Sequence, residues 1–220
     1  MNILQIEDDV NWFEETVKPL LIELGAKTVL HEETHDDAIN TINSNQIDYV
    51  ILDLAIPLNN DNPVPDASHG IQLASYIRSR FAGTPILILT GQQTEDAVVR
   101  FVEDQELTTF WDGKLKSLVK VRPKRLVSQA IELLSEAAKE LEAIDAIEID
   151  ESGCELNVLE KRVIRIFCKE NSAIAARVKS LNGGLSSAKV LQVTLIGNNG
   201  DSLPWSALVK IDSKHNVDKE

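Results

Sequence analysis

The sequence predicts an α/β fold, a doubly wound parallel sheet of five strands, with a small α+β appendage at its C-terminal end. Two observations carry this prediction. Short apolar runs alternate with amphipathic stretches through the first 145 residues, as in chains of β-α units. The runs at residues 48–52 and 86–89 are almost continuously apolar, which is typical of strands buried on both faces of a parallel sheet.

The elements follow from hydrophobic spacing and from turn residues. Period-two or continuous apolar runs predict strands, and apolar residues three and four apart predict helices, several of which end near Gly or Pro. The predicted strands are residues 3–6, 28–30, 48–52, 86–89 and 118–121. The predicted helices are residues 12–24, 36–42, 70–81, 94–102 and 123–144.

The appendage begins after a change in charge near residue 150. We predict a domain over residues 1–145, a linker or short strand over 146–156, and a small output segment over 157–220. Its helical spacing runs from Val158 to Val178. Two strands, Lys189–Ile196 and Trp205–Ile211, are joined by a turn rich in Gly and Asn.

Composition excludes several classes of function. The chain has 220 residues and a net charge of −13, carried mainly by residues 1–150, so nucleic acid is not an expected partner. Two cysteines indicate reduced thiols. The sequence has no apolar run long enough to cross a membrane and no secretion signal at its start, so we expect a cytoplasmic protein.

Polar residues stand where the predicted strands end. Glu7 and Asp8 follow the first strand, Asp53 the third and Thr90 the fourth, and Lys120 lies near the end of the fifth. Parallel strands bring such residues to one edge of the sheet. Carboxylates held close together suit Mg²⁺, and a metal, a Lys and a hydroxyl beside a nucleophilic carboxylate suit phosphoryl transfer.

Three segments carry a resemblance to a known family. They are residues 3–9 (ILQIEDD), residues 49–57 (YVILDLAIP) and residues 85–91 (PILILTG). In this order and on these strands they resemble the signature segments of two-component response-regulator receiver domains. The resemblance covers about residues 1–145 and implies a flavodoxin-like fold.

The resemblance implies a role for each matching residue. Asp53 would accept the phosphoryl group, and Glu7, Asp8, Asp53 and the Ala55 carbonyl would bind Mg²⁺. Thr90 would be the switch hydroxyl. The implied phosphate donor is a histidine kinase or a phosphotransfer protein, and the implied activity is that of a signalling switch without a separate substrate.

Three features depart from the family pattern. The favoured phosphate-binding Lys is Lys120, with Lys124 and Lys114 as alternatives, and Trp111 near Lys114 is either core or the aromatic switch. Residues 107–117 look like an insertion before the fifth strand. The loop between Asp53 and Gly70 is longer than usual. It is either a solvated loop, or a segment that gates the cleft or offers a surface to a partner.

Trp12 and the long helix before the appendage lie outside the three signature segments. Trp12 fits the core face of the first helix. The second half of the helix ending near residue 144 is a surface for a partner or a second copy of the chain, or a connector to the appendage.

The output segment weakly resembles the start of a kinase-like or phosphotransferase-like domain. Gly183, Gly184 and Ser186 would form a phosphate-covering loop, and Lys210 would grip the phosphates. A small α+β appendage that packs or dimerises is the alternative. For the whole chain, the alternatives to a phosphorylated switch are a phosphorylation-independent interaction module and the regulatory front end of a nucleotide-binding phosphotransferase.

Overall fold

The computed structural model describes residues 1–81, 83–91, 107–181 and 189–212. It divides into two compact units. The first unit comprises residues 1–108 and 116–138, and the second unit comprises residues 109–115 and 139–220. The division differs from the predicted boundary at residue 145, since it falls within the long helix α6 and assigns part of the 107–117 insertion to the second unit.

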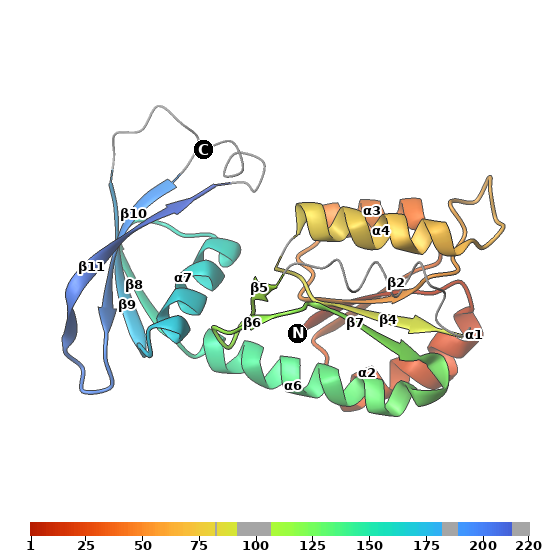
Figure 1. The fold of residues 1–220 in the computed structure, drawn as a ribbon, viewed down its shortest axis with the longest axis horizontal. Helices are drawn as coiled ribbons and strands as arrows, with labels where there is room; N and C mark the ends of the chain where they lie inside the picture. Colours follow the sequence, from red (N-terminus) through yellow and green to blue (C-terminus); the bar gives the residue numbers. More distant parts are fainter. Residues whose placement is uncertain (82, 92–106, 182–188, 213–220) are drawn as a thin grey trace. The chain divides into compact units, whose positions relative to one another are not determined.

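The first unit contains a five-stranded parallel sheet in the order β2-β1-β3-β4-β7 (Figure 1). This confirms the predicted doubly wound fold. Each strand follows one of the predicted apolar runs, although β2 and β7 each extend two residues further than expected. The strands are β1 (Asn2–Ile6), β2 (Thr28–Glu32), β3 (Tyr49–Asp53), β4 (Ile86–Thr90) and β7 (Val119–Pro123).

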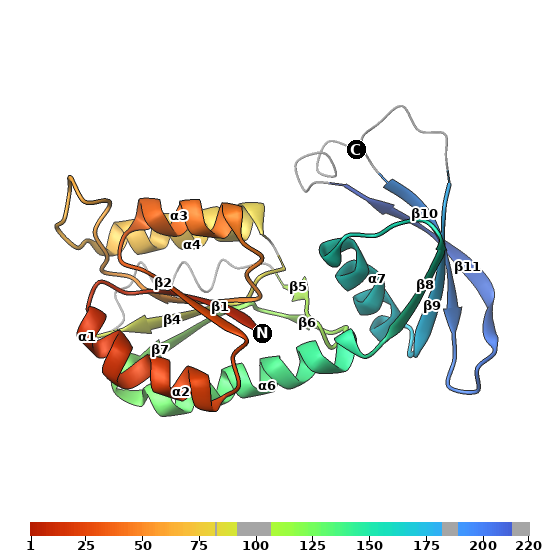
Figure 2. The same cartoon turned by 180° about the vertical axis from the view of Figure 1, so that it is seen from behind.

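Helices cover both faces of this sheet. Helices α3 and α4 lie on one face, and α1, α2 and the first part of α6 lie on the other (Figures 1 and 2). The predicted helix over residues 94–102 falls outside the described residues. The helical segments are α1 (Val10–Trp12), the π-helical turn η1 (Phe13–Val17), α2 (Lys18–Glu23), α3 (His35–Ser44), α4 (Ala67–Arg80), the 3₁₀ turn η2 (Lys124–Leu126) and α6 (Val127–Asp145).

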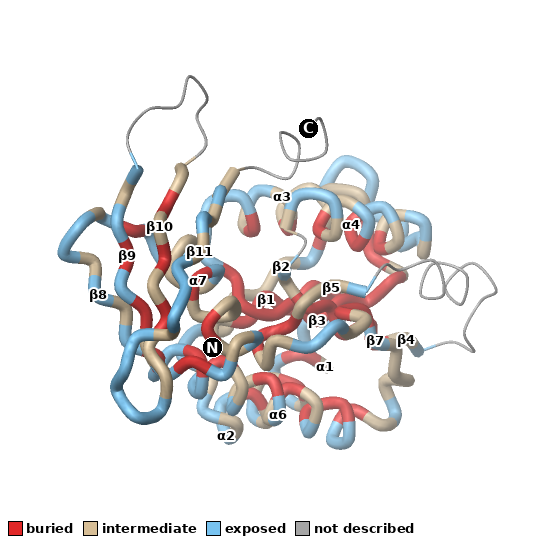
Figure 3. The backbone as a smooth tube through the Cα atoms, turned by 60° about the vertical axis from the view of Figure 1, so that its left-hand side comes forward, coloured by how far each residue is buried: buried red, intermediate tan, exposed pale blue. Residues whose placement is uncertain are grey.

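The central strands are inaccessible to solvent. All five residues of β3 are buried, and the tube of β1 and β3 is almost continuously red in Figure 3. Apolar side chains from α3 and α4 pack on one face of these strands. Burial on both faces explains why the sequence shows continuous apolar runs here rather than alternation.

The second unit is built on a four-stranded sheet in the order β11-β10-β9-β8, with α7 on one face (Figure 2). β8 and β9 are parallel and are joined through α7, whereas β10 and β11 pair antiparallel. Within the predicted linker, residues 148–153 are therefore a strand. The elements are β8 (Glu148–Gly153), α7 (Val158–Glu170), β9 (Ala175–Ser180), β10 (Lys189–Ile196) and β11 (Ser202–Ile211).

The prediction of one helix from Val158 to Val178 is wrong beyond Glu170. A turn at Ser172, whose φ is +56°, ends the helical path, and β9 begins at Ala175. The insertion before β7 contains a two-stranded ladder of β5 (Thr108–Thr109) and β6 (Leu115–Lys116). No helix in the described ranges has the length and apolar character of a membrane span.

Candidate functional site

Three carboxylates meet at the carboxyl edge of the first unit's sheet. β1 and β3 pair in parallel with Ile6 opposite Leu52, so Glu7 and Asp53 emerge from neighbouring strands at the same level. Asp8 joins them, and one ligand oxygen of each of the three lies within 4.8 Å of the other two. Glu7 is fully buried and Asp53 nearly so. This oxygen set fits a hard divalent cation such as Mg²⁺.

Lys124 contacts two of these carboxylates, Glu7 and Asp53. Its Nζ lies 2.8 and 2.7 Å from the two oxygens of Glu7 and 2.7 Å from Oδ2 of Asp53. Pro123 ends β7 and precedes the 3₁₀ turn η2, which begins with Lys124. The strand therefore delivers this side chain to the same edge as the carboxylates.

The preference for Lys120 does not agree with these contacts. Lys120 lies within β7, opposite Leu87 of β4, and is exposed. Because β7 runs on to Pro123, the position after the strand belongs to Lys124, the alternative that the sequence left open. Lys114 lies in the second unit, where its carbonyl accepts a hydrogen bond from the Phe110 N–H.

Burial governs the electrostatics of Glu7. Burial, with a smaller contribution from the neighbouring Asp53, raises the pKa of the Glu7 carboxyl to about 7 against the lowering effects of Lys124 and the Asp9 N–H. That N–H donates to Oε1 of Glu7 at 3.1 Å. His31 Nε2 lies 2.8 Å from the Glu7 carbonyl oxygen, and its ring stacks on Phe13 at 4.1 Å. Glu7 is therefore fixed through both its backbone and its side chain.

Burial disfavours the charged forms of both Asp53 and Lys124, whereas the contact between them favours both charges. Burial raises the pKa of Asp53, although Lys124 and the backbone N–H groups of Ala55 and Leu54 favour its ionised form. Burial alone would lower the pKa of Lys124, but hydrogen bonds to Asp53 and Glu7 outweigh it and raise the pKa. Lys124 therefore stays charged beside the carboxylates.

The remaining predicted site residues lie along the same edge. Thr90 is the last residue of β4 and stands opposite Pro123 of β7. Ala55 lies in the turn directly after Asp53, half-buried, with its N–H engaged by Asp53. Asp53 pairs with Leu89 of β4, so Thr90 lies one residue beyond the level of Asp53, and Ala55 follows Asp53 by two positions in the sequence.

The long loop after Asp53 is organised rather than merely solvated. Ile56 and Asp66 form an antiparallel bridge at its base, and Asn59 and Asn62 form another near its tip. Its carbonyls at positions 57 and 58 accept hydrogen bonds from the first N–H groups of α3. Asn59 also donates to Asp36 at 2.8 Å. These contacts tie the loop to the N-terminus of α3, while residues 60–66 are exposed.

Sequence reasoning missed the role of Trp12. Its ring is half-buried and lies 4.7 Å, centroid to Nζ, from Lys124, so it belongs to the site rather than simply to the core. The available signal was its position four residues after Asp8, within one turn of the acidic segment.

Gln5 is a second unexpected residue beneath the site. It precedes Glu7 by two positions on β1 and therefore shares its face of the sheet, opposite Ile51 of β3. Its side chain is fully buried, and neither amide atom has a hydrogen-bond partner in the described part of the chain. An unpaired buried amide costs folding free energy.

Replacing Gln5 by leucine is therefore expected to stabilise the protein by about 1–2 kcal/mol, because the desolvation cost of the amide disappears. Urea unfolding of the full chain measures the effect. Gln72→Leu, on an exposed position of α4, is the matched control and should change stability by less than about 0.5 kcal/mol. A destabilised Gln5→Leu protein would show that the amide is hydrogen-bonded in solution.

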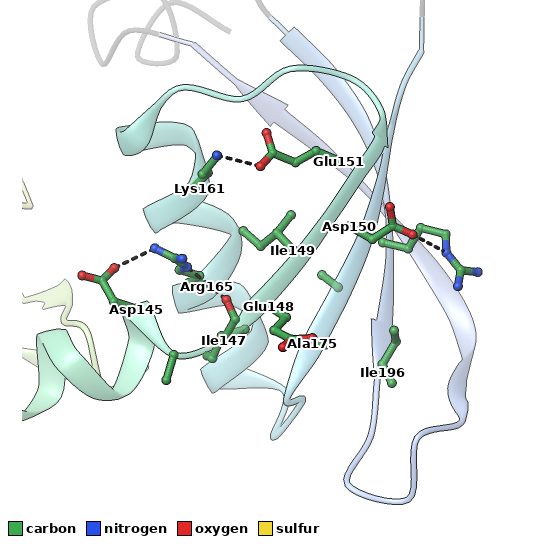
Figure 4. Close-up of a pocket in the computed structure, with 13 residues that line it drawn as sticks. Asp145, Ile147, Glu148, Ile149, Asp150, Glu151, Lys161, Arg165, Ala175 and Ile196 are labelled. Atoms are coloured by element: carbon green, nitrogen blue, oxygen red, sulfur yellow. Dashed lines mark hydrogen bonds and ion pairs between the residues drawn. The ribbon is translucent and has the colours of Figure 1, made fainter.

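The second unit has a charged pocket of about 460 Å³ beside β8 (Figure 4). Arg165 donates to Asp145 at 2.6 Å and to the Ile147 carbonyl at 3.2 Å. Lys161 pairs with Glu151, and Arg177 pairs with Asp150. Each of these three cations is already matched by a carboxylate, which favours a structural role over anion binding.

The predicted phosphate-covering loop of the second unit, with Gly183, Gly184 and Ser186, falls outside the described residues. Lys210 lies on β11 and is exposed. The kinase-like interpretation of this segment therefore stays a prediction. Trp111 is buried, stacks on Phe110 and is covered by Arg162, all within the second unit, which agrees with a core role.

Most of the first unit is similar to a known protein family. Residues 3–108 match the response regulator receiver domain. The match spans slightly less than half of the chain and includes Glu7, Asp53 and Thr90. It supports a phosphorylatable signalling role for the first unit.

Solved structures of receiver domains are similar to this chain. A CheY-like response regulator receiver domain protein from Methanospirillum hungatei JF-1 is 19% identical, with 63% of this chain and 97% of that chain covered and a TM-score of 0.45. The receiver domain of a putative Luxo repressor protein from Vibrio parahaemolyticus is also 19% identical, with 66% and 96% covered and a TM-score of 0.47. No curated protein matches the chain.

Proposed function

We propose that the chain is a response regulator whose first unit accepts a phosphoryl group on Asp53 and whose second unit responds to it. The observation that carries this proposal is the cluster of Glu7, Asp8 and Asp53, with oxygens within 4.8 Å of one another, together with Lys124 on two of them. A charged Lys beside a buried carboxylate nucleophile suits phosphoryl transfer, which depends on positioning and charge stabilisation.

In the proposed reaction, an Asp53 oxygen forms a bond to the phosphorus of a phosphorylated donor while the donor's own bond to that phosphorus breaks. The product is an aspartyl phosphate. Lys124 and the Thr90 hydroxyl would bind phosphoryl oxygens. Glu7, Asp8, Asp53 and the Ala55 carbonyl would hold Mg²⁺, which neutralises charge on the transferred group. A histidine kinase or a phosphotransfer protein would be the donor.

Intact-mass measurement after incubation with acetyl phosphate tests this function. Wild type should gain one phosphate in the presence of Mg²⁺ and none in its absence, and Asp53→Asn should gain none. Asp61→Asn, in the exposed loop, is the matched control and should behave as wild type. A folded wild-type protein that binds Mg²⁺ yet takes no phosphate would favour the phosphorylation-independent interaction module.

Magnesium affinity should depend on pH through Glu7. With its pKa at about 7, Glu7 is mostly protonated at pH 6 and mostly ionised at pH 8. Because only the carboxylate binds the cation well, the apparent Kd for Mg²⁺ should fall roughly tenfold between these values. Titration calorimetry measures it. Glu7→Gln should bind more weakly and lose this dependence, and a wild-type Kd that is flat with pH would contradict the assignment.

A further inference from the structure

We propose that Trp12 is a positioning residue for Lys124, holding its ammonium group over the phospho-accepting carboxylate by a cation–π contact. The inference rests on the proposed function and extends it to a residue outside the signature segments. Trp12 ends α1, which lies at the carboxyl edge of the sheet (Figure 1). Its ring centroid lies 4.7 Å from Lys124 Nζ.

The Lys124 ammonium group is held on several sides. Glu7 and Asp53 take its hydrogen bonds at 2.7–2.8 Å, and Trp12 offers the face of its ring. An indole face is the strongest aromatic partner for a cation, and the attraction grows as the cation loses water. The Lys124 side chain is only 21% exposed, so this contact is largely desolvated.

The position of Trp12 is itself fixed by the acidic segment. Its backbone N–H donates to Oδ1 of Asp9 at 3.0 Å, and Asp9 caps the start of α1. The Asp9 N–H donates in turn to Glu7 at 3.1 Å. Glu7, Asp9, Trp12 and Lys124 therefore form a closed ring of contacts. The π-helical turn η1 begins directly after Trp12, and such turns are frequent at functional sites.

The face of an aromatic ring suits the positioning of the Lys124 ammonium group better than a third carboxylate would. It attracts the ammonium group but accepts no strong hydrogen bond from it, so it does not compete for the donors that phosphoryl oxygens need. When Asp53 takes up the phosphoryl group, the carboxylate contacts of Lys124 must rearrange, whereas the ring contact can persist. Trp12 therefore keeps Lys124 in place during the reaction.

Variants of Trp12 in the full chain separate this role from simple packing. With acetyl phosphate and Mg²⁺, we expect Trp12→Leu to be phosphorylated about tenfold more slowly than wild type and Trp12→Phe to be intermediate. Leucine keeps an apolar side chain but has no ring face. The Kd for Mg²⁺ should stay within about twofold, since Trp12 acts on Lys124 and not on the metal ligands.

A double-variant cycle gives the decisive comparison. Lys124→Met lacks the cation, so adding Trp12→Leu to it should change the rate by less than about twofold. Equal rates for wild type and Trp12→Leu would overturn the inference. An equal loss on adding Trp12→Leu in the wild-type and Lys124→Met proteins would overturn it as well.

An unphosphorylated wild type would refute the proposed function, and the positioning role is then tested by fluorescence. In a Trp111→Phe/Trp205→Phe background, Trp12 is the sole tryptophan. Replacing Lys124 by methionine in that background should change its emission intensity or wavelength, because the ammonium group leaves the ring. Unchanged emission would overturn the positioning role.

Discussion

Replacing Lys124 by methionine is expected to slow phosphorylation of Asp53 by acetyl phosphate roughly a hundredfold, the usual effect of removing one preorganised charge from a reacting oxyanion. Lys124 is the cation whose Nζ lies within 2.8 Å of both Asp53 and Glu7. Methionine fills similar space without charge. The rate is followed by intact mass over a time course in saturating Mg²⁺.

Lys120→Met is the matched control for this prediction. Lys120 has the same side chain four residues earlier, but it is exposed on β7, and its loss should change the rate by less than about twofold. If Lys120→Met slowed the reaction and Lys124→Met did not, the assignment of the phosphate-binding Lys would be reversed. Equal slowing in both would point to a general electrostatic effect.

The position of the site lysine could be predicted from the sequence only to within a few residues. The apolar run Leu118–Val121 predicted the fifth strand, but hydrophobicity does not show where such a strand stops. The hydrogen-bonded ladder with β4 continues to Pro123, and this moves the end of the strand from Lys120 to Lys124. By contrast, β1 ends at Ile6 with its apolar run, directly before Glu7, and β3 ends only one residue beyond its apolar run, at Asp53 itself.

The wrong helix end in the second unit has a similar cause. Ile174 and Val178 are four residues apart and fit a helix, but Val178 lies in β9, a strand with alternating burial, and Ile174 directly precedes this strand. Ala176 and Val178 are buried against the sheet core, while Arg177 and Lys179 are exposed. Pairing with β10 favours the strand spacing over the helical spacing, and a local sequence pattern does not show which strands will pair.

Trp12 and Gln5 depend on tertiary contacts that no local pattern reveals. A Trp on the first turn of a helix is consistent with either a core or a site position until the end of β7 is known. Gln5 interrupts an apolar run, which suggests an exposed residue, yet it is buried. Buried polar residues of this kind depart from local rules, and such departures concentrate near functional sites.

Replacing Gly70 by alanine is expected to destabilise the first unit by about 3 kcal/mol, because the new methyl group has no space. A Cβ at this position would lie 2.5 Å from both the Cα and the carbonyl oxygen of Leu54. The backbone there cannot rotate away as a side chain could. The Gly70 N–H also donates to the Leu54 carbonyl at 3.2 Å, so the helix and this segment are joined closely.

The expected damage reaches the candidate site, since Leu54 lies between Asp53 and Ala55. Thermal and urea unfolding measure the stability, and a Mg²⁺ titration at a temperature where the variant is folded should show weaker binding. Gly83→Ala is the matched control, because a Cβ at Gly83 would meet nothing within 4 Å. Its stability should change by less than about 1 kcal/mol.

If Gly70→Ala were as stable as Gly83→Ala, α4 would be free to shift away from Leu54. An unchanged Mg²⁺ affinity in a destabilised Gly70→Ala protein would show instead that the turn carrying Ala55 is held independently of the contact between Gly70 and Leu54, by the bridge between Ile56 and Asp66.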